Sequence, residues 1–578
     1  MDNTLVSARL DETADLLEID GANSFRVRAY RNAARLMEDL PVPVAELSVM
    51  GAARLEELPG IGADLAAKLV SLVQHGTFPQ LEELRAKIPA GVRDMLRIPG
   101  LGPKKAAVLF KDLAVDSLDK LREACKLNQV KALKGFGEKT QTAILKGLEQ
   151  LATTGRRVSI AEARPVADAL AHSLRAVPGV VRVEPAGSVR RYRETIGDLD
   201  LLCTSTDVRQ VMDALAGHPW VEEVLARGET KQRVRLTSGI ELDLRVVPET
   251  SFGAAMQYFT GSKEHNIVVR QRALDRGLKV NEYGVFRGET QIAGATEEDV
   301  YAAVDLAWIP PEMRENRGEI ARAEAGPIPR LVETADLRGD LHMHTTATDG
   351  TASIAEMIEA AIARGREYIA ITDHSKRVTI ANGLDANRLR AHWQAIEQVR
   401  ADYPQIKVLK GIECDILEDA TLDLPDDVLA EADFVVAVLH FGLQQSRDEI
   451  HARFLTAIRN PYVDVIGHPT ARIVDKRPPV AANMDEILKA AADYGVMMEI
   501  NANPSRLDLP DTLAATAREL GIPLTISSDA HSTTGMDVLT WGASQARRAG
   551  CEPKHIATAW RWPEFHALLT RKRPRAGL

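Results

Sequence analysis

The chain has 578 residues, which is long enough for several domains that each bury their own hydrophobic core. Its 45% hydrophobic and 27% charged residues are typical of a globular protein, and no apolar run approaches the roughly 20 residues that a membrane span needs. The N-terminus is acidic and periodic rather than signal-like, and the four scattered cysteines argue against a disulfide framework, so the composition predicts a cytoplasmic protein.

Charge is unevenly distributed along the chain. The net charge is −10, yet residues 101–150 carry ten Lys/Arg against six Asp/Glu, whereas residues 401–450 carry three against twelve. Charge alone does not assign a partner, because a run of lysines is also common on a solvated helix face. The local basic excess nevertheless leaves binding to a phosphate backbone open, despite the negative total.

Residues 1–150 predict helices joined by short loops, because apolar residues recur at helical spacing and the segments end at Gly or Pro. Three related sequences interrupt them, each followed by a helical stretch: LPGIG at 58–62, IPGLG at 98–102 and LKGFG at 133–137. Two glycines one residue apart allow a tight hairpin that exposes backbone N–H groups at the start of the next helix, where an anion binds well.

A single hairpin of this kind is also compatible with an ordinary turn between helices. Three copies favour contacts with nucleic-acid phosphates that do not depend on base sequence. In the second copy Pro103 suits the first helical turn, and Lys104 adds charge. The pattern resembles the helix-hairpin-helix DNA-binding motif. The candidate DNA contacts are Gly60, Gly62, Gly100, Gly102, Lys104, Gly135 and Gly137.

From about residue 156 the pattern changes to alternating strands and helices. In the strand GDLDLL, Asp198 and Asp200 share one face while the leucines point to the core, and Asp243 in ELDLRV has the same arrangement. Three carboxylates on neighbouring strands suit two Mg²⁺ or Mn²⁺ ions, which would activate a hydroxyl and stabilise a leaving pyrophosphate. An isolated pair of strand carboxylates is also common at a surface without a metal.

The sequence GSVRR, upstream of the first acidic strand, strengthens the metal hypothesis. Gly187 lets a phosphate approach the backbone, Ser188 supplies a hydroxyl, and the adjacent Arg190 and Arg191 supply charge. A phosphate-binding turn beside clustered carboxylates is the arrangement that transfer of a phosphoryl group needs.

These motifs and YFTGS at 258–262 closely resemble the family X DNA polymerases, the group of DNA polymerase beta, over essentially all of residues 1–310. The resemblance implies that Asp198, Asp200 and Asp243 bind the metals and that Asp243 is the base toward the primer 3′-OH. It also implies contacts with the incoming nucleotide and the new base pair. Those residues are Gly187, Ser188, Arg191, Tyr258, Phe259, Gly261, Asn266 and Arg270.

Within that set the resemblance implies separate roles. Ser188 and Arg191 would contact the triphosphate of the incoming nucleotide. Tyr258 and Phe259 would pack beside its sugar and discriminate against a 2′-OH. The last two residues of the set, from GSKEHNIVVR, would face the minor-groove edge of the new pair and the template.

The N-terminal part also resembles the small lyase domain of that group, and Lys68 falls at the position of its Schiff-base lysine. The implied chemistry is attack of the amine on the sugar aldehyde of a 5′-deoxyribose phosphate. Asp64 stands where a basic residue is usual and the following loop lacks lysines, so the resemblance does not extend to recognition of the 5′-phosphate. A solvated helix lysine is the alternative interpretation of Lys68.

Residues 312–337 are charged, contain Pro and lack a strand pattern, and they predict a linker that either permits motion or is held in place. After this segment, strands and helices alternate. Residues 353–365 predict a helix that begins with a capping box between Ser353 and Glu356 and ends at Gly365.

Nine candidate metal ligands follow short apolar runs in this C-terminal part. Such runs between helices predict buried parallel strands, whose carboxyl ends meet at one mouth of a barrel. Histidines mixed with carboxylates suit two or three Mn²⁺ or Zn²⁺ ions that polarise a phosphoester and activate a water. A bound metal without catalysis is the alternative. The ligands are His342, His344, Asp349, His374, Glu413, His440, His468, Asp529 and His531.

The pattern HMH, TDH, GIE, VLH, GHP and DAH resembles the PHP (polymerase and histidinol phosphatase) domain, as does EINANPSRLDL at 499–509. That resemblance implies a distorted seven-stranded βα barrel. A family X core followed by a PHP domain resembles the bacterial and archaeal branch of the family. In that branch the PHP domain implies Mn²⁺-dependent 3′→5′ exonuclease activity, and in some members 3′-phosphatase or abasic-site endonuclease activity.

The predicted fold is therefore multidomain. It has a helical N-terminal region with helix-hairpin-helix motifs, an α+β nucleotidyltransferase palm with a C-terminal polymerase subdomain, and a (βα)7 TIM-like PHP barrel. The predicted order is a lyase-like domain at 1–85, a DNA-binding subdomain at 86–150, the palm at 151–250, a nucleotide-selecting subdomain at 251–311, the linker at 312–337 and the PHP domain at 338–575.

The leading interpretation is a repair polymerase that fills short gaps and trims or cleans 3′ ends. Its expected partners are gapped or nicked duplex DNA with a 3′ primer end, dNTPs and, as a further candidate, a DNA ligase; we expect a monomer associated with the nucleoid and no membrane partner. A second hypothesis is a phosphoesterase acting on small phosphorylated metabolites, with the first half used only for binding. A third is a DNA-binding scaffold in which one of the two sites is inactive.

Overall fold

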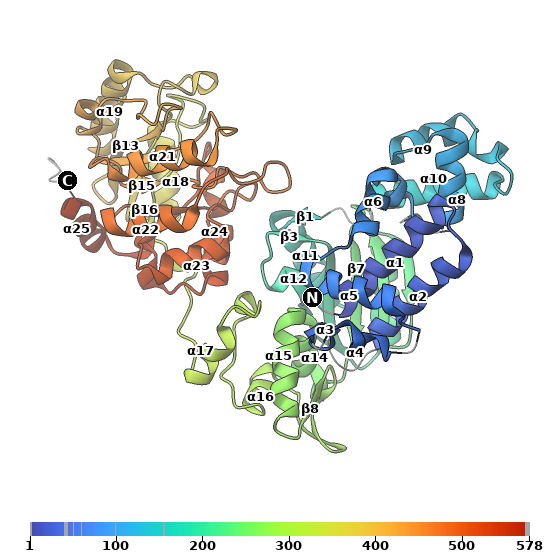
Figure 1. The fold of residues 1–578 in the computed structure, drawn as a ribbon. Helices are drawn as coiled ribbons and strands as arrows, with labels where there is room; N and C mark the ends of the chain where they lie inside the picture. Colours follow the sequence, from blue (N-terminus) through green and yellow to red (C-terminus); the bar gives the residue numbers. More distant parts are fainter. Residues whose placement is uncertain are drawn as a thin grey trace. The chain divides into compact units, whose positions relative to one another are not determined.

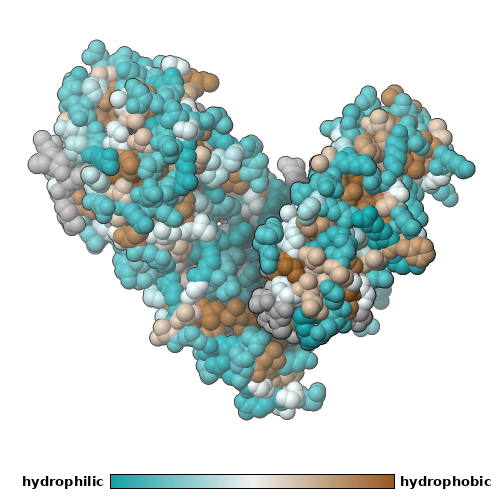
Figure 2. All heavy atoms as spheres, viewed as in Figure 1, coloured by the Kyte–Doolittle hydropathy of each residue, from teal (hydrophilic) through white to brown (hydrophobic). Residues whose placement is uncertain are grey.

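The computed structural model describes residues 3–39, 44–49, 51–58, 60–96, 98, 100–153 and 157–572. The chain divides into two compact units, Met1–Arg156 and Arg157–Leu578, and each is described by itself (Figure 1). Among the described residues, no helix is both long enough and apolar enough to cross a membrane. Figure 2 shows one face of the molecule, on which hydrophilic residues prevail over smaller hydrophobic areas.

The first unit is helical, as predicted. Its described residues pack around two apolar cores. Side chains from the stretch Val6 to Ala107 form the first core, and side chains from the stretch Met95 to Leu148 form the second. Its elements are α1 (Asn3–Asp20), α2 (Ser24–Asp39), α3 (Val44–Val49), α4 (Ala52–Glu56), α5 (Ala63–His75), α6 (Pro79–Lys87), α7 (Ala90–Met95), α8 (Pro103–Leu113), α9 (Leu118–Lys126), η1 (Val130–Ala132) and α10 (Glu138–Thr153).

The second unit begins with a five-stranded sheet in the order β2-β4-β7-β6-β5, in which β4 and β7 are parallel and the other neighbours are antiparallel. One face, with Leu199 and Leu242, packs on α11 and α13, and Leu202 on the opposite face packs on α14. The elements are β1 (Val158–Ser159), α11 (Ile160–Arg175), β2 (Val180–Pro185), α12 (Gly187–Arg190), β3 (Thr195–Ile196), β4 (Asp198–Ser205), α13 (Val208–Ala216), β5 (Val221–Arg227), β6 (Lys231–Leu236) and β7 (Glu241–Val246).

A small α+β region follows, in which three antiparallel strands have the order β10-β9-β8. Its core joins α15 and α16 around Tyr301, which is completely buried. The elements are η2 (Glu249–Ser251), α14 (Phe252–Thr260), α15 (Lys263–Leu274), β8 (Lys279–Asn281), β9 (Gly284–Arg287), β10 (Thr290–Ala293) and α16 (Glu297–Ala302).

The segment predicted as a linker is held in place. It contains η3 (Pro311–Met313), α17 (Glu319–Ala325) and η4 (Thr334–Asp336). Arg314 is fully buried and donates from Nη1 to Glu297 Oε1 at 2.6 Å, and Glu319 Oε1 lies 2.7 Å from Nδ1 of the buried His265. These buried polar contacts attach the segment to the region that precedes it.

The C-terminal part is a barrel of seven parallel strands in sequential order, surrounded by helices (Figure 1). Met343, beyond β11, forms a parallel bridge with Ala530, beyond β17, so the first and last strands meet. The strands are β11 (Gly339–Asp340), β12 (Tyr368–Ile371), β13 (Lys407–Asp415), β14 (Phe434–Val438), β15 (Val465–Ile466), β16 (Met497–Asn501) and β17 (Leu524–Ser527). The predicted (βα)7 barrel is confirmed.

The predicted helix at 353–365 is confirmed as α18, with its capping box between Ser353 and Glu356. The barrel helices are α18 (Ile354–Ala363), α19 (Ala386–Arg400), α20 (Asp426–Leu429), α21 (Arg447–Arg459), α22 (Met484–Tyr494), α23 (Asp511–Glu519), α24 (Leu539–Arg548) and α25 (Trp562–Lys572). Short 3-10 turns are η5 (Thr379–Ala381), η6 (Thr534–Val538), η7 (Pro553–His555) and η8 (Ala557–Ala559).

Successive side chains of a barrel strand point into two different hydrophobic cores. Ile369 and Ile371 pack with the surrounding helices, whereas Tyr368 and Ala370 pack with α25, where Phe565 stacks on Tyr368 with ring centroids 4.7 Å apart. Leu507, in the loop before α23, is completely buried and belongs to the core of the five-stranded sheet rather than to the barrel. An apolar side chain of the barrel thus completes the sheet's core.

Candidate metal centres

The aspartate cluster lies on two neighbouring strands. β4 and β7 are parallel, and their register sets Asp200 opposite Asp243 and Asp198 opposite Glu241. Burial, and then the charges of Asp198 and Asp243, raise the pKa of Asp200 to about 7. Carboxylates that suppress one another's ionisation in this way fit a divalent cation, because a cation stabilises their charges and Mg²⁺ and Mn²⁺ prefer oxygen ligands.

Asp243 also contacts the adjacent strand. Arg233 on β6 lies opposite it and donates to its Oδ2 from Nη2 at 2.6 Å and from Nε at 3.1 Å. The other oxygen, Oδ1, is buried and has no hydrogen-bond partner within the described part of the chain. An orphaned buried oxygen beside two further carboxylates fits a metal ligand. Sequence reasoning missed Arg233, although the alternation in RVRL indicates a strand with its arginines on one face.

A cleft of about 430 Å³ adjoins this cluster. Asp198 and Asp200 line it, and Lys263 and Ile267 are lining residues that sequence reasoning did not identify. The structure also brings the whole predicted nucleotide-binding set to the cleft wall: Gly187, Ser188, Arg191, Tyr258, Phe259, Gly261, Asn266 and Arg270. The cleft therefore joins the GSVRR turn, two aromatic rings and the two aspartates of β4 in one space.

The GSVRR turn is only partly as predicted. Gly187 has a φ of 62°, and a side chain there would collide with the Asp200 carboxylate, so this position requires glycine. Arg191 lines the cleft, but Arg190, expected to supply charge beside it, makes a bidentate pair with Glu297 at 2.7 and 2.8 Å. The prediction for Arg190 was wrong because successive residues of a helix point about 100° apart, so adjacent arginines face different neighbours.

The glycine hairpins repeat one backbone geometry. Gly60, Gly100 and Gly135 have φ values of 81°, 79° and 86°, a left-handed conformation that favours glycine. Their partners Gly62 and Gly102 cap the N-termini of α5 and α8. No described atom lies within 4 Å of a Cβ built on these glycines or on Gly137, so the hairpins are open. Lys104 follows the second hairpin with its side chain 87% exposed.

Lys68 is less exposed than a solvated helix lysine. Its side chain is 15% exposed, and Nζ lies 2.5 Å from Asp64 Oδ2 and 2.8 Å from the hydroxyl of Tyr30. The ammonium also lies 5.9 Å from the centroid of the Phe78 ring. The structure therefore places Lys68 in a partly aromatic environment with a carboxylate as its ion-pair partner.

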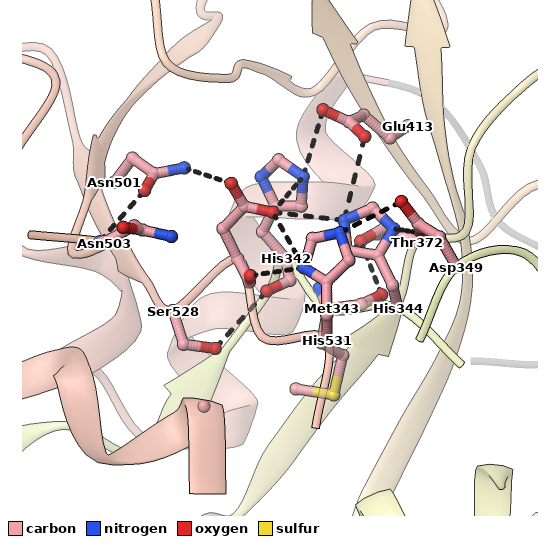
Figure 3. Close-up of polar contacts among 12 residues, drawn as sticks. His342, Met343, His344, Asp349, Thr372, Glu413, Asn501, Asn503, Ser528 and His531 are labelled. Carbon is pink, nitrogen blue, oxygen red and sulfur yellow. Dashed lines mark hydrogen bonds and ion pairs between the residues drawn. The ribbon is translucent and has the colours of Figure 1, made fainter. Parts of the chain in front are cut away.

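The nine predicted ligands of the C-terminal part meet at the carboxyl ends of the barrel strands. His342 and His344 follow β11, His374 follows β12, and Glu413 lies near the end of β13. The remaining five follow β11, β14, β15 or β17. These are Asp349, His440, His468, Asp529 and His531. Figure 3 shows the labelled histidines and carboxylates pointing toward one another, and all nine belong to groups whose ligand atoms lie within 4.8 Å of one another.

Glu413 is central to this cluster. Its carboxylate oxygens lie 2.6 Å from His374 Nδ1, 3.0 Å from His468 Nε2 and 3.2 Å from His342 Nε2. A fourth histidine, His440, lies 3.5 Å away through Nε2. A fifth, His344, lies 3.7 Å away through Nε2. Because one carboxylate faces five imidazoles, Glu413 could be shared between metal ions held by these histidines.

A second set of contacts surrounds His344. Its Nε2 lies 3.2 Å from Asp529 Oδ1, and its ring stacks with the rings of both His374 and His531 at centroid distances of 4.3 and 4.1 Å. Asp349 completes this group with Oδ2 3.4 Å from Nε2 of both His374 and His531.

The electrostatics of the cluster fit a metal centre. Burial, and then the charge of His374, lower the pKa of His344 to about 4. Burial acts in the same sense on His374, but the carboxylates of Glu413 and Asp349 outweigh it and raise its pKa to about 10. Among the described residues, His374 Nδ1 and Glu413 Oε2 are buried and form a close ion-pair contact at 2.6 Å rather than a well-aligned hydrogen bond. Imidazoles and carboxylates that converge in this way are what a metal would satisfy, with release of the bound protons.

Several residues that sequence reasoning did not identify orient the ligands. Glu499 on β16 lies 2.8 Å from His342 Nδ1 and accepts from the backbone N–H of His468 at 2.6 Å. Asp415 on β13 lies 2.9 Å from His440 Nδ1. Figure 3 shows Asn501 reaching toward the cluster, and its Nδ2 donates to Asp529 at 3.1 Å. The sequence contained a signal for these positions, because alternate residues of EIN and ECD share a strand face.

Four family models match the chain, and together they cover most of its length. Their matches are the DNA polymerase beta thumb at residues 255–315, a helix-hairpin-helix domain at 1–78, a SAM-like helix-hairpin-helix tandem at 92–150 and a PHP domain at 340–503. The helical first unit and the barrel described above coincide with the last three of these matches.

Similar curated proteins fall into two groups. The DNA polymerase/3′-5′ exonuclease PolX of Bacillus subtilis (strain 168) is 37% identical over 566 residues, which cover 97% of this chain and 98% of that protein. A protein named Probable phosphatase from Thermoanaerobacter sp. (strain X514) is 33% identical over 204 residues, covering 33% of this chain and 78% of that protein. A Probable phosphatase of Caldanaerobacter subterraneus is 29% identical over 203 residues, covering 33% and 75%.

Proposed function

Because the chain belongs to the family X DNA polymerases that carry a C-terminal PHP domain, we propose that it extends primers in short DNA gaps and removes nucleotides from 3′ ends. The observation that carries this proposal is the presence of two separate clusters of metal-ligand residues, one beside the nucleotide cleft and one at the barrel mouth. Both reactions act on a 3′ end, so one chain would either extend an end or clean it.

At the cleft, Asp198, Asp200 and Asp243 would hold two Mg²⁺ or Mn²⁺ ions, which supply Lewis acidity toward the primer hydroxyl and the leaving pyrophosphate. Ser188 and Arg191 would bind the triphosphate, because a hydroxyl and a guanidinium at the same turn match phosphate oxygens. Asp243 would also accept the proton of the primer 3′-OH, because its carboxylate lies beside the other two metal-binding candidates.

The other end of the cleft would select the sugar and base. The rings of Tyr258 and Phe259 lie 5.0 Å apart at the end of α14, where they would pack beside the sugar and disfavour a 2′-OH. Asn266 donates from Nδ2 to the Tyr258 carbonyl and accepts from Gln257, both at 2.7 Å, so its amide is oriented. Arg270 lies one turn further along α15, and both residues would reach the minor-groove edge.

At the barrel mouth, the nine ligands would hold two or three Mn²⁺ or Zn²⁺ ions, which supply a hydroxide at neutral pH and polarise the scissile phosphodiester. Glu413 would be shared between ions because it faces five histidines. Glu499 and Asp415 would hold His342 and His440 in position, since a carboxylate on the far ring nitrogen fixes the tautomer and increases ligand basicity.

The hairpins would bind the phosphates of the DNA flanking a gap. Gly60, Gly100 and Gly135 lie in open hairpins, whose backbone N–H groups would contact phosphate oxygens regardless of base sequence. Gap filling leaves a nick, so a DNA ligase is the partner that the reaction product requires. We place the protein at the nucleoid as a monomer.

A third activity, removal of a 5′-deoxyribose phosphate, would use Lys68. Its partly buried position between Tyr30 and Phe78 gives the amine a defined environment, and a substrate would displace Asp64 from its contact with the amine.

The experiment that tests the proposal is a single gel. A 5′-labelled primer on a gapped duplex is incubated in Mg²⁺ or Mn²⁺, with and without dNTPs. We expect a longer product with dNTPs and a shorter product without them. Extension without shortening would contradict the nuclease assignment, shortening without extension would contradict the polymerase assignment, and neither would favour small phosphoesters as substrates.

A further inference from the structure

Arg191, assigned above to the nucleotide triphosphate, is held from two sides. Its Nε donates to Glu315 Oε1 at 3.1 Å, and its Nη1 donates to the carbonyl of Thr260 at the end of α14. The side chain is 13% exposed. Because a long arginine side chain has many rotamers, two fixed donors restrict the guanidinium to the wall of the cleft.

The carboxylate that holds Arg191 is itself held by the barrel. Arg548, the last residue of α24, donates from Nη1 to Glu315 Oε1 at 3.0 Å and to the backbone carbonyl of Arg191 at 2.6 Å. The side chain of Arg548 is only 1% exposed. One buried guanidinium of the barrel therefore contacts both the backbone and the ion-pair partner of a residue in the nucleotide cleft.

Arginines and carboxylates alternate along a series of ion pairs that continues into the barrel. Arg548 Nη2 lies 2.7 Å from Asp511 Oδ2 at the start of α23, and Arg317 Nη2 lies 2.8 Å from the same oxygen. Burial opposes ionisation of Glu315, but the charges of Arg548 and Arg191 outweigh it and lower its pKa. Arg548 thus has a carboxylate on each side, and Glu315 has a guanidinium on each side.

This alternation has a consequence for Arg191. Glu315 also lies 3.7 Å from Arg193 Nη1, so three arginines share it. A carboxylate shared in this way attracts each arginine less than it would attract one alone, and a triphosphate competes with that carboxylate for Arg191. Without Arg548, Glu315 would keep a full charge for Arg191, and the backbone at Arg191 would lose its anchor. Both effects would weaken the hold of Arg191 on phosphate oxygens.

We propose that Arg548 and Glu315 are positioning residues through which the PHP barrel sets the affinity of the polymerase cleft for the incoming nucleotide. The inference rests on the proposed function, because it takes Arg191 as a triphosphate ligand. Under this proposal the barrel contributes to nucleotide binding in the polymerase cleft, and the candidate metal ligands of the barrel have no part in that contribution.

The test compares Arg548→Met with Arg547→Met. Arg547 is the preceding residue of α24 and pairs with Glu312 at 2.8 Å, so its loss also removes a buried contact with segment 312–337. For Arg548→Met we expect KM for the dNTP on a one-nucleotide gap to rise about tenfold with kcat within about twofold, since the lost interaction acts on binding. Exonuclease activity should equal that of the wild type.

A second variant separates positioning from a general structural effect. Adding Glu315→Gln to Arg548→Met removes the charge that competes for Arg191, so KM should return toward the wild-type value. The Kd of a dNTP on a dideoxy-terminated gapped duplex, where no chemistry occurs, should follow the same order. An Arg548→Met KM equal to that of Arg547→Met, a loss of exonuclease activity with it, or a KM that Glu315→Gln does not restore would overturn the inference.

These outcomes differ from failure of the proposed function. A wild-type chain that does not extend the primer contradicts the polymerase assignment itself. A wild-type chain that extends the primer, combined with an unchanged dNTP Kd in Arg548→Met, contradicts only the link between the barrel and the cleft.

Discussion

Asp200 and Asp243 lie opposite each other on the parallel strands β4 and β7, and the charge of Asp243 contributes to the raised pKa of Asp200. Parallel pairing sets equivalent positions of two strands side by side, so the two carboxylates share one space. The Asp243 carboxylate accepts a hydrogen bond from the Arg233 guanidinium at 2.6 Å, whereas the Asp200 carboxylate lies against the GSVRR turn at Gly187. Asp200 is thus the carboxylate through which the aspartate cluster adjoins the GSVRR turn.

Asp200→Ala should abolish primer extension and spare trimming of 3′ ends. Removing one of three carboxylates leaves too few oxygen ligands for two ions, and we expect extension to fall by about 10³-fold. The measurement is the gapped-duplex gel with and without dNTPs. Asp213→Ala, at an exposed position of α13, is the matched control and should extend normally. Loss of both activities in Asp200→Ala would argue against two independent sites.

His344→Ala should have the converse effect. His344 is completely buried and belongs to two of the candidate ligand groups, so its loss disrupts both. We expect trimming to become undetectable in Mn²⁺ while the rate of extension stays within about twofold, because the cleft residues are unchanged. His451→Ala on α21, which removes a histidine paired with Glu486, is the control. Normal trimming by His344→Ala would assign the nuclease to other residues.

Glu499→Gln should weaken the nuclease without removing a ligand. The lost carboxylate orients His342 through Nδ1, and outer partners of this kind change metal affinity by about 10–100-fold. Trimming measured against Mn²⁺ concentration should shift to higher concentration, with activity recovered at saturation. Glu519→Gln, an exposed position of α23, serves as the comparison. An unchanged Mn²⁺ dependence would mean that Glu499 does not position the ligand.

Glu297→Gln should destabilise the fold. Glu297 is 8% exposed and pairs with Arg190 at 2.7 Å and with the fully buried Arg314 at 2.6 Å, and breaking such a buried pair costs about 3–5 kcal/mol. Thermal unfolding of Glu297→Gln should have a lower midpoint than that of the wild type. Glu298→Gln, a change at the exposed neighbouring position, should leave the midpoint unchanged. A midpoint equal to that of the wild type would show that the arginines are satisfied without this carboxylate.

The contribution of Glu297 to the stability of the fold should also depend on pH. Although burial opposes ionisation, Arg314 and Arg190 hold the pKa of Glu297 well below its usual range. Its contribution to stability is therefore complete above the ordinary glutamate pKa and is lost as pH falls toward the depressed value in the folded state. The difference in unfolding midpoint between wild type and Glu297→Gln should be constant near neutral pH and shrink in acid.

Lys68→Ala should abolish trapping of a 5′-deoxyribose phosphate substrate by borohydride. A Schiff base forms only with the amine, so reduction would link wild-type protein to DNA and leave the variant unlinked. Lys105→Ala is the control, because this lysine contacts the Gly100 carbonyl in the neighbouring hairpin region and should not affect trapping. Equal trapping by Lys68→Ala and the wild type would assign the lyase, if present, to another amine.

The sequence predicted the residues whose chemistry is local and missed those defined by packing. The convergence of the nine candidate ligands could be predicted because each follows an apolar strand and has a side chain of a metal-binding type. Arg233 and Glu499 were missed because their roles depend on strand register and on which strands are neighbours, as in the pairing of Arg233 with Asp243. Arg548 was missed for a stronger reason, since its partners at the cleft, Arg191 and Glu315, lie more than 200 positions away in the chain.

Because Leu507 is buried in the core of the sheet, the polymerase part and the barrel cannot simply be separated by truncating the chain. A leucine of the barrel fills part of the sheet's core, and Arg472 of the barrel pairs with Glu194 of the sheet region at 2.6 Å. A truncated chain ending before the barrel would expose an apolar gap and unpaired charges that water cannot satisfy equally well. Polymerase and nuclease are therefore not interchangeable modules in this chain, and an engineered polymerase fragment would need replacement side chains at the exposed surface before its activity could be compared with that of the whole protein.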